Sequence, residues 1–152
     1  MQVYRIVDRR YQNDLSGTGA KLYGGRWNKI DQPVLYTTSS VSLACLELLV
    51  NVDLRFKTPN YMLLTIAVPD DCSARQITNK DLPKNWRSKD SYSRTKEIGS
   101  NWFQEQLESA LLVPSAVIPQ ETNYIFNVHH PTIKDIKITK SEPFIFDNRL
   151  LK

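Results

Sequence analysis

The sequence predicts an α+β fold with a largely antiparallel sheet, organised as one domain over residues 1–152. Segments with strand character outnumber segments with helix character by about three to one. The strand-rich second half has no helices between its strands, which favours antiparallel pairing. The chain also lacks a GxGxxG motif and a P-loop, so a doubly wound nucleotide-binding fold is not expected.

The first half of the chain is predicted to alternate strands with longer connections. Residues 1–7, MQVYRIV, alternate apolar and polar side chains and predict a strand. Residues 8–27 form a long connection that holds four of the five glycines of the chain. Short apolar runs then predict strands over residues 33–38 and 60–69, the second of which ends at a proline.

The second half combines a helix with several strands. Residues 70–95 are polar, and we expect a loop or a short helical turn there. A helix is expected over about 95–110, because its apolar residues fall near one stripe. That stripe consists of Ile98, Trp102, Phe103, Leu107, Ala110 and Leu111. The four candidate strands, separated by prolines, are residues 111–118, 123–128, 133–139 and 142–147.

A helix over residues 39–52, with Ser39 or Ser40 as its N-cap, contains the most informative carboxylate. Apolar residues occupy two nearly opposite stripes, so the helix is expected to be buried on two sides. Glu47 is the only ionisable residue between Ser39 and Asn51 and lies at the seam of the two stripes. It either reaches solvent along that seam or is held at the edge of a cleft, with Arg26 as a candidate partner.

Composition and charge exclude several classes of protein. Apolar residues make up 41% of the chain and charged residues 24%, which is typical of a globular domain. The net charge is +4, and the densest basic cluster is Arg5, Arg9 and Arg10, so a solvated mixed surface is favoured over a nucleic-acid interface. Two cysteines without metal-ligand spacing predict neither a disulfide scaffold nor a zinc site. No signal peptide or membrane-length apolar run is present, so we expect a cytoplasmic protein without membrane contact.

The remaining candidate residues each have a structural and a functional interpretation. Ser115 lies between two prolines and either stabilises a turn or contacts a ligand at a rigid strand end. Asn123 and Asn127 either cap turns or present amides to a ligand. Trp27 is more typical of core or rim packing than of a ligand platform. His129 and His130 are adjacent, their side chains point apart, and we interpret them as structural or surface residues.

Five segments, taken in order, resemble the RES domain over roughly residues 4–150. These segments are GGRWN, PVLYTTSSVSLACLELLV, IGSNW, LLVPSAVIPQETNYIFNVHHP and PFIFDNRL. Each segment alone is a weak signal, but the five together in one domain are a strong one. The resemblance implies a split, mostly antiparallel β core with flanking helices, similar to that of ADP-ribosyltransferase toxins, which bind NAD⁺ without a Rossmann motif.

The resemblance also implies an activity and partners. RES proteins are toxins of toxin–antitoxin pairs and are encoded with an Xre-like helix-turn-helix antitoxin. They deplete cellular NAD⁺ by hydrolysis or phosphorolysis at the nicotinamide bond, or transfer ADP-ribose to a protein. NAD⁺ would then be the substrate, with no further cofactor and no metal. The toxin would form a hetero-oligomer with its antitoxin and reach DNA only through it.

The family pattern assigns roles to named positions. It places the catalytic residues at Arg26, Tyr36, Glu47 and Ser115. Arg26 would grip a phosphate, Tyr36 would pack on the nicotinamide, and Ser115 would contact the ligand or orient Glu47. Beside these family positions, we expect Gly25, Trp27, Asn123 and Asn127 to take part in substrate binding together with Arg26 and Tyr36. The chain departs from the family pattern, at turn and helix-face positions, at Asp31, Ser100, Val128 and Asn148.

Two rival functions remain open at the level of the sequence. A non-enzymatic regulatory module could use the basic surface to bind nucleic acid, in which case binding would depend steeply on salt. A serine hydrolase acting through Ser115 lacks a G-x-S-x-G elbow and a credible base. Both rank below NAD⁺ consumption.

Overall fold

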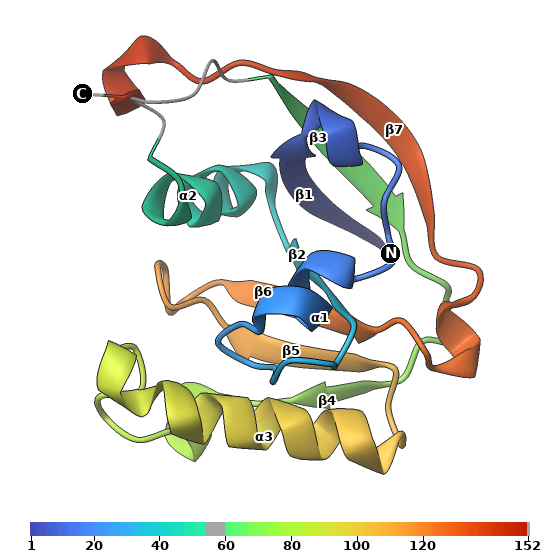
Figure 1. The fold of residues 1–152 in the computed structure, drawn as a ribbon, viewed down its shortest axis with the longest axis vertical. Helices are drawn as coiled ribbons and strands as arrows, with labels where there is room; N and C mark the ends of the chain where they lie inside the picture. The colour runs from blue at the N-terminus through green and yellow to red at the C-terminus, as the bar shows by residue number, and fades with distance from the viewer. Residues whose placement is uncertain (54–59, 152) are drawn as a thin grey trace.

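A seven-stranded sheet organises the fold of the computed structural model, which describes residues 1–53 and 60–151 (Figure 1). The strand order is β4-β5-β6-β2-β1-β3-β7, and every pair is antiparallel except β4 with β5. This arrangement confirms the predicted α+β class with a mostly antiparallel sheet. The strands are β1 (Gln2–Asp8), β2 (Val34–Thr38), β3 (Tyr61–Ala67), β4 (Ala74–Gln76), β5 (Ala110–Pro114), β6 (Thr122–Asn127) and β7 (Lys137–Phe144).

The sheet is split between β1 and β2. These two strands share a single register pair, Tyr4 with Thr38. By contrast, β1 pairs with β3 along its whole length, from Gln2 to Asp8, and β2 pairs with β6 along its whole length. Figure 1 accordingly shows β1, β3 and β7 in one part of the molecule and β4, β5 and β6 in another, with β2 between them. The split core expected from the family resemblance is therefore present.

The α-helices in the described part of the chain cover the two half-sheets. They are α1 (Thr18–Tyr23), α2 (Val41–Asn51) and α3 (Tyr92–Glu105). Ser40 caps α2 as one of the two expected serines, because its hydroxyl accepts from the Leu43 N–H at 3.2 Å. Ala44 and Cys45 pack α2 onto Ile6 and Leu63 of β1 and β3. The indole of Trp102 packs α3 into a separate core with Leu111 and Ile125.

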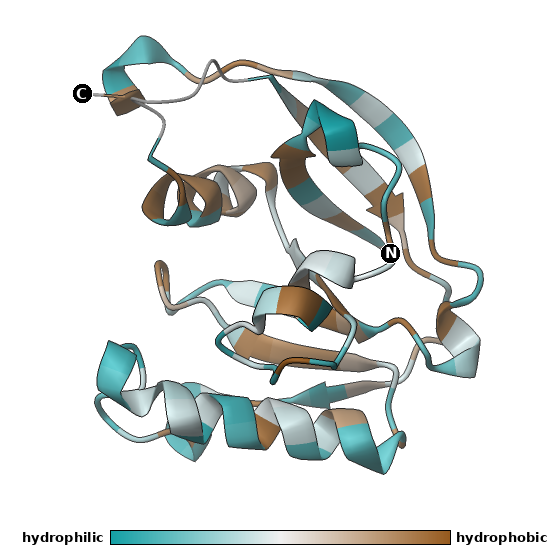
Figure 2. Cartoon of the chain, in the orientation of Figure 1, coloured by the Kyte–Doolittle hydropathy of each residue, from teal (hydrophilic) through white to brown (hydrophobic). Residues whose placement is uncertain are grey.

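The predicted burial of α2 on two sides is only partly correct. Figure 2 shows α2 coloured hydrophobic over most of its length, whereas α3 is mixed. Leu43, Ala44 and Cys45 are buried, but Val50 of the second stripe is 63% exposed. The second stripe is therefore buried at Leu43, near the start of α2, and exposed at Val50, near its end.

Several predicted boundaries were wrong for local reasons. The connection over 8–27 contains the 3₁₀ helix Arg9–Tyr11 and α1, which is too short to show a period in the sequence. The polar stretch over 70–95 contains β4, a three-residue edge strand. The short helical turn expected in that stretch is present as the 3₁₀ helices Asn79–Asp81 and Lys89–Ser91. The described part of the chain also contains the 3₁₀ helices Pro131–Ile133 and Asn148–Leu151.

The helix predicted over 95–110 begins and ends earlier than expected. It stops at Gln106, whose φ of 55° places it in the left-handed region. Leu107 is therefore 68% exposed, and Ala110 and Leu111 belong to β5. None of the helices in the described residues is long and apolar enough to cross a membrane.

The two last candidate strands form one strand. β7 runs through Pro143, which the sequence pattern had placed at a break. β7 is an edge strand of the sheet, and an edge strand tolerates a residue that lacks an N–H. Its pairing with β3 shifts in register between Thr65 and Ile66, which accommodates the irregular sequence.

Candidate active site

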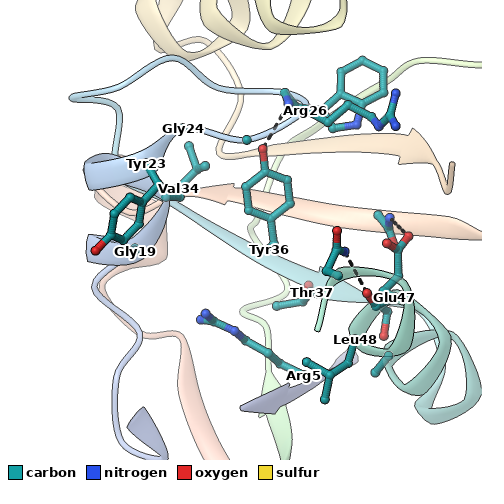
Figure 3. Close-up of a pocket in the computed structure, with 18 of the residues that line it drawn as sticks. Arg5, Gly19, Tyr23, Gly24, Arg26, Val34, Tyr36, Thr37, Glu47 and Leu48 are labelled. Carbon is teal, nitrogen blue, oxygen red and sulfur yellow. Dashed lines mark hydrogen bonds between the residues drawn. The ribbon is translucent and has the colours of Figure 1, made fainter. Parts of the chain in front are cut away.

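A pocket of about 840 Å³ lies where the sheet splits (Figure 3). Its walls come from β1, β2, α1 and the loop that follows it, α2, β6 and the N-terminal part of α3. Because β1 and β2 pair only at Tyr4 and Thr38, side chains of both strands line it. The volume falls in the range of about 300–1,000 Å³ that is typical of ligand pockets. The pocket is therefore large enough for a dinucleotide.

Glu47 reaches this pocket from α2. Its Oε1 accepts hydrogen bonds from Ser115 Oγ at 2.8 Å and from Asn123 Nδ2 at 2.7 Å. Within the described part of the chain, Oε2 has no hydrogen-bond partner. The functional interpretation of Glu47, a carboxylate held at the edge of a cleft, therefore fits the geometry better than a side chain free in solvent.

Ser115 lies directly behind Glu47. It follows Pro114, the last residue of β5, so it occupies the rigid strand end that the sequence suggested. Its side chain is fully buried, and its Oγ accepts from the N–H groups of Val117 and Ile118, both at 3.0 Å. A hydroxyl has one hydrogen to donate, and Ser115 donates it to Glu47. Ser115 is not among the residues that line the pocket, so its position is that of a support for Glu47.

Asn123 supports the same carboxylate from β6. Unlike Ser115, it also lines the pocket. Its Oδ1 is buried and has no hydrogen-bond partner among the described residues. A buried acceptor without a donor is costly, so Asn123 pays part of the cost of holding the Glu47 carboxylate at the pocket wall.

The loop that follows α1 depends on close packing around Tyr36. The Tyr36 hydroxyl donates to Asn28 Oδ1 at 2.8 Å and accepts from the Trp27 N–H at 3.1 Å. Burial raises the pKa of Tyr36 well above its ordinary value. A Cβ on Gly25 would lie 2.7 Å from this hydroxyl, so only glycine allows the loop to approach it.

Asn28 is a site residue that the sequence analysis missed. It is fully buried, and its Nδ2 donates to the carbonyl groups of Ala20, Lys29 and Gln32. Together with the Tyr36 hydroxyl, these bonds fix the loop from residue 24 to residue 32. The only signal in the sequence was the position of Asn28 inside GGRWN.

Arg26 is held by a different part of the protein than expected. Its Nη1 donates to the Trp86 carbonyl at 3.0 Å, and its Nη2 donates to the Arg87 carbonyl and the Tyr92 hydroxyl. Its guanidinium also lies 4.2 Å from the centre of the Tyr92 ring. The predicted pairing with Glu47 is therefore wrong, because the side chain is directed toward residues 86–92. Only Nε and one N–H of Nη1 stay available to a ligand.

Two other predicted binding residues have structural positions. Trp27 is 2% exposed, and its ring packs against Trp86 with the centroids 6.1 Å apart. It lines the pocket but offers a ligand almost no accessible surface. Asn127 lies at the far end of β6 and outside the pocket lining. Its Oδ1 accepts from the His129 N–H at 3.0 Å, which is the turn-capping alternative.

The departures from the family pattern lie away from Glu47. Asp31, where glycine is usual, has a φ of 70°, a region that glycine enters without steric cost. Ser100 is buried rather than on an exposed helix face, and its hydroxyl accepts from Gln32 Nε2 at 2.7 Å. Val128 packs at the edge of the core, and Asn148 begins the last 3₁₀ helix. In residues 1–53 and 60–151, no group of His, Cys, Asp and Glu side chains is arranged to hold a metal ion.

Comparison with known proteins places this geometry in context. A family model described as the RES domain matches residues 2–147. A protein of Sphingobium sp. (strain YBL2), named Prs ADP-ribosylating toxin, is 40% identical over 147 residues, which is 95% of this chain and 91% of that protein. A protein of Photorhabdus laumondii subsp. laumondii, named toxin Res, is 41% identical over 160 residues and covers 100% of this chain and 98% of its own.

A solved structure shares the fold. The crystal structure of the M. tuberculosis MbcT–MbcA toxin–antitoxin complex contains a chain that superimposes with a TM-score of 0.76. The two chains are 22% identical, and the match covers 94% of this chain and 83% of that one.

Proposed function

The chain belongs to the RES domain family, and from this premise we propose that it is the enzymatic toxin of a toxin–antitoxin pair. The chemistry we propose is cleavage of the nicotinamide–ribose bond of NAD⁺. The observation that carries the proposal is the carboxylate of Glu47, held at the wall of a dinucleotide-sized pocket by two neutral donors. No cation neutralises it among the described residues.

This carboxylate suits the transition state of N-glycosidic cleavage. NAD⁺ carries a cationic nicotinamide, which leaves as a neutral base when the bond to ribose breaks. Positive charge then develops on the ribose in an oxocarbenium-like state, which a fixed carboxylate stabilises. Water attacking the ribose carbon gives ADP-ribose and a proton, whereas phosphate gives phosphorylated ADP-ribose.

The other pocket residues would bind and orient the ligand. The ring of Tyr36 would pack against the nicotinamide, and the close approach allowed by Gly25 would bring the loop backbone to the ligand. Asn123 would hold the Glu47 carboxylate at the pocket wall through its Nδ2. Ser115 would act through Glu47 by fixing its rotamer.

Transfer of ADP-ribose to a protein is the second candidate. One relative is named Prs ADP-ribosylating toxin, and ADP-ribosylation would cleave the same bond of NAD⁺. Only the acceptor differs, so Glu47 would have the same role. The likeness in fold to a chain of a toxin–antitoxin complex supports an antitoxin partner, and we propose that it is an Xre-like helix-turn-helix protein.

The test follows the release of nicotinamide from NAD⁺ by the purified protein freed of any antitoxin. The assay is run with water alone, with added phosphate, and with cell lysate and radiolabelled NAD⁺ to detect labelled protein. We expect release in at least one of these conditions. Its absence in all three would contradict the proposal.

Glu47→Gln tests the role of the carboxylate. The amide oxygen can accept the same two hydrogen bonds, so the fold should persist while the charge is lost. We expect turnover to fall by about 100-fold or more, with little change in the affinity for NAD⁺. Glu97→Gln, at an exposed position paired with Arg94, is the matched control and should retain full turnover. Equal turnover in the two variants would remove Glu47 from the mechanism.

A further inference from the structure

Glu121 joins the two elements that hold the carboxylate of the site, although it does not itself line the pocket. It lies at the end of the turn that connects β5 to β6, directly before Thr122, the first residue of β6. Its carboxylate accepts a hydrogen bond from Ser40 Oγ at 3.0 Å, and its carbonyl oxygen accepts from the Ser115 N–H at 2.9 Å. One residue therefore contacts both the cap of α2 and the serine that supports Glu47.

The bond to Ser40 is made at the N-terminus of α2. Ser40 Oγ accepts from the Leu43 N–H, and its single hydrogen is donated to Glu121. The first turn of α2 contains no acidic residue of its own. Because a carboxylate near a helix N-terminus interacts favourably with the helix dipole, Glu121 supplies from another element the negative charge that α2 lacks there.

The turn that carries Glu121 is itself closed by hydrogen bonds. The Glu121 N–H donates to the Ile118 carbonyl at 2.9 Å. A further backbone bond, from the Ser39 N–H to the Thr122 carbonyl at 3.2 Å, joins the corner before α2 to the start of β6. Within residues 1–53 and 60–151, Ser40 is the hydrogen-bond partner of the Glu121 carboxylate, and no cation lies within 4 Å of it.

The helix α2 is thus attached to the β5–β6 region at two levels. Its cap, Ser40, bonds to Glu121, and further along the helix Glu47 bonds to Ser115 and Asn123. Seven positions separate Ser40 from Glu47, which is about 10 Å along a helix at 1.5 Å per residue. A helix attached at one level can pivot about it, whereas attachment at two levels fixes its axis. The place of the Glu47 carboxylate therefore depends on a contact about two turns away.

We propose that Glu121 is a positioning residue for the reaction: its bond to Ser40 fixes α2 on the β5–β6 turn and so sets where the Glu47 carboxylate lies. Glu121 acts through Glu47 and does not touch the substrate. The inference rests on the proposed function, since it explains how the carboxylate of that same site is oriented. A displacement of about 1 Å at a reacting group can cost about 100-fold in rate, so a distant contact can control turnover.

Steady-state kinetics of nicotinamide release, in the condition that supports it, test this role. Glu121→Ala should lower kcat by about 10-fold and leave KM within about twofold of wild type, because the carboxylate acts on the transition state. Glu121→Gln should restore kcat to within about threefold of wild type, since its amide oxygen can still accept from Ser40. Glu142→Ala removes a carboxylate paired with Lys140 on the edge strand β7, and this matched control should keep wild-type kinetics.

A double-mutant comparison separates positioning from a general loosening of the pocket. In the Glu47→Gln background, Glu121→Ala should change kcat by less than about twofold, because the charge that it positions is already absent. Equal falls in the two backgrounds would overturn the inference. So would an alanine variant with wild-type kcat, or a glutamine variant as slow as the alanine variant. All rates are measured below the melting range of each ligand-free variant, so that unfolded protein does not lower kcat.

Carbon-13 NMR of the glutamate carboxyl groups tests the contact without any reaction. Glu47→Gln identifies the Glu47 signal by its disappearance. We expect this signal to move in ligand-free Glu121→Ala and to stay in place in Glu142→Ala. A Glu47 signal that does not move in Glu121→Ala contradicts the positioning role.

The inference and the proposed function fail separately. A Glu47 signal that moves in Glu121→Ala, without nicotinamide release in any condition, overturns only the proposed function. Nicotinamide release by wild type, with kcat and the Glu47 signal both indifferent to Glu121→Ala, overturns only the inference.

Discussion

At the scale of single residues, the hydrogen bonds around Glu47 explain why its carboxylate can act on a positive charge. Ser115 accepts from two backbone N–H groups and donates to Glu47, so the bonds reinforce one another. Both partners of Glu47 are neutral. An arginine in their place would neutralise the carboxylate before substrate arrived. Holding Glu47 with a hydroxyl and an amide preserves its charge for the transition state.

Tyr36 gives a prediction for the pH dependence of stability. Burial raises its pKa in the folded protein, so the folded state keeps the proton at a pH where the unfolded chain loses it. The stabilisation that depends on this proton is complete below the unfolded pKa of about 10 and is lost as the pH rises above it. The free-energy advantage of wild type over Tyr36→Phe should then fall by up to about 1.4 kcal/mol for each pH unit.

Urea unfolding of both proteins at several values between about pH 8 and pH 11 measures this difference. At about pH 8, Tyr36→Phe should be less stable than wild type by about 1–3 kcal/mol, because Asn28 Oδ1 and the Trp27 N–H lose the hydroxyl to which they are bonded. Comparison of the two proteins cancels the contribution of Tyr61, whose pKa is also raised by burial. A difference that stays constant across the range would show that Tyr36 titrates normally.

At the scale of elements, α3 and the loop after α1 are fitted to each other at Gly99. A Cβ at this position would lie 1.7 Å from the Trp27 carbonyl oxygen, which is backbone and cannot rotate away. Gly99→Ala should therefore destabilise the fold by about 1–3 kcal/mol or more, although alanine has the higher helix propensity. It should also displace the loop that carries Gly25 and Arg26.

The matched substitution is Gly19→Ala in α1, where no atom lies within 4 Å of the added Cβ. This variant should be as stable as wild type or more stable, since alanine is the better helix former. Thermal unfolding of the two variants measures the contrast. Equal melting temperatures would mean that α3 shifts to admit a methyl group and that the contact with the loop is not tight.

At the scale of the whole molecule, the site depends on the two half-sheets meeting at one register pair. The pocket takes Arg5 from one half and Tyr36 from the other, and α2 brings Glu47 to the seam. A ligand that contacts all three would connect the halves. Binding should then stabilise both of them, because a ligand that binds only the folded state adds its binding free energy.

Hydrogen exchange of Glu47→Gln with NAD⁺ tests this, since the ligand is not consumed. We expect slower exchange in β1 and in β2, on both sides of the split. Nicotinamide alone, which lacks the phosphates, should protect the segment near Tyr36 and leave β1 unchanged. Protection confined to one half-sheet in the presence of NAD⁺ would contradict a site shared between them.

The sequence by itself determined the elements with a clear apolar period. The strands at β1, β2 and β3 and the helix at α2 with its serine cap could be predicted, because periodicity and capping are local properties. Glu47 stood out for the same reason, as a lone charge on an apolar helix. Short elements such as α1 and β4 carry too few residues to show a period, and they were missed.

Only the tertiary structure decided which side chains meet. Sequence order placed Arg26 near Glu47, yet the loop turns it toward Tyr92, and Ser115 and Asn123 arrive from the other half of the sheet. The split after Tyr4 turned Arg5, one member of an ordinary basic cluster, into a cation inside the pocket. Such partners are far apart in the chain, and their meeting depends on strand register and packing, which leave no local trace in the sequence.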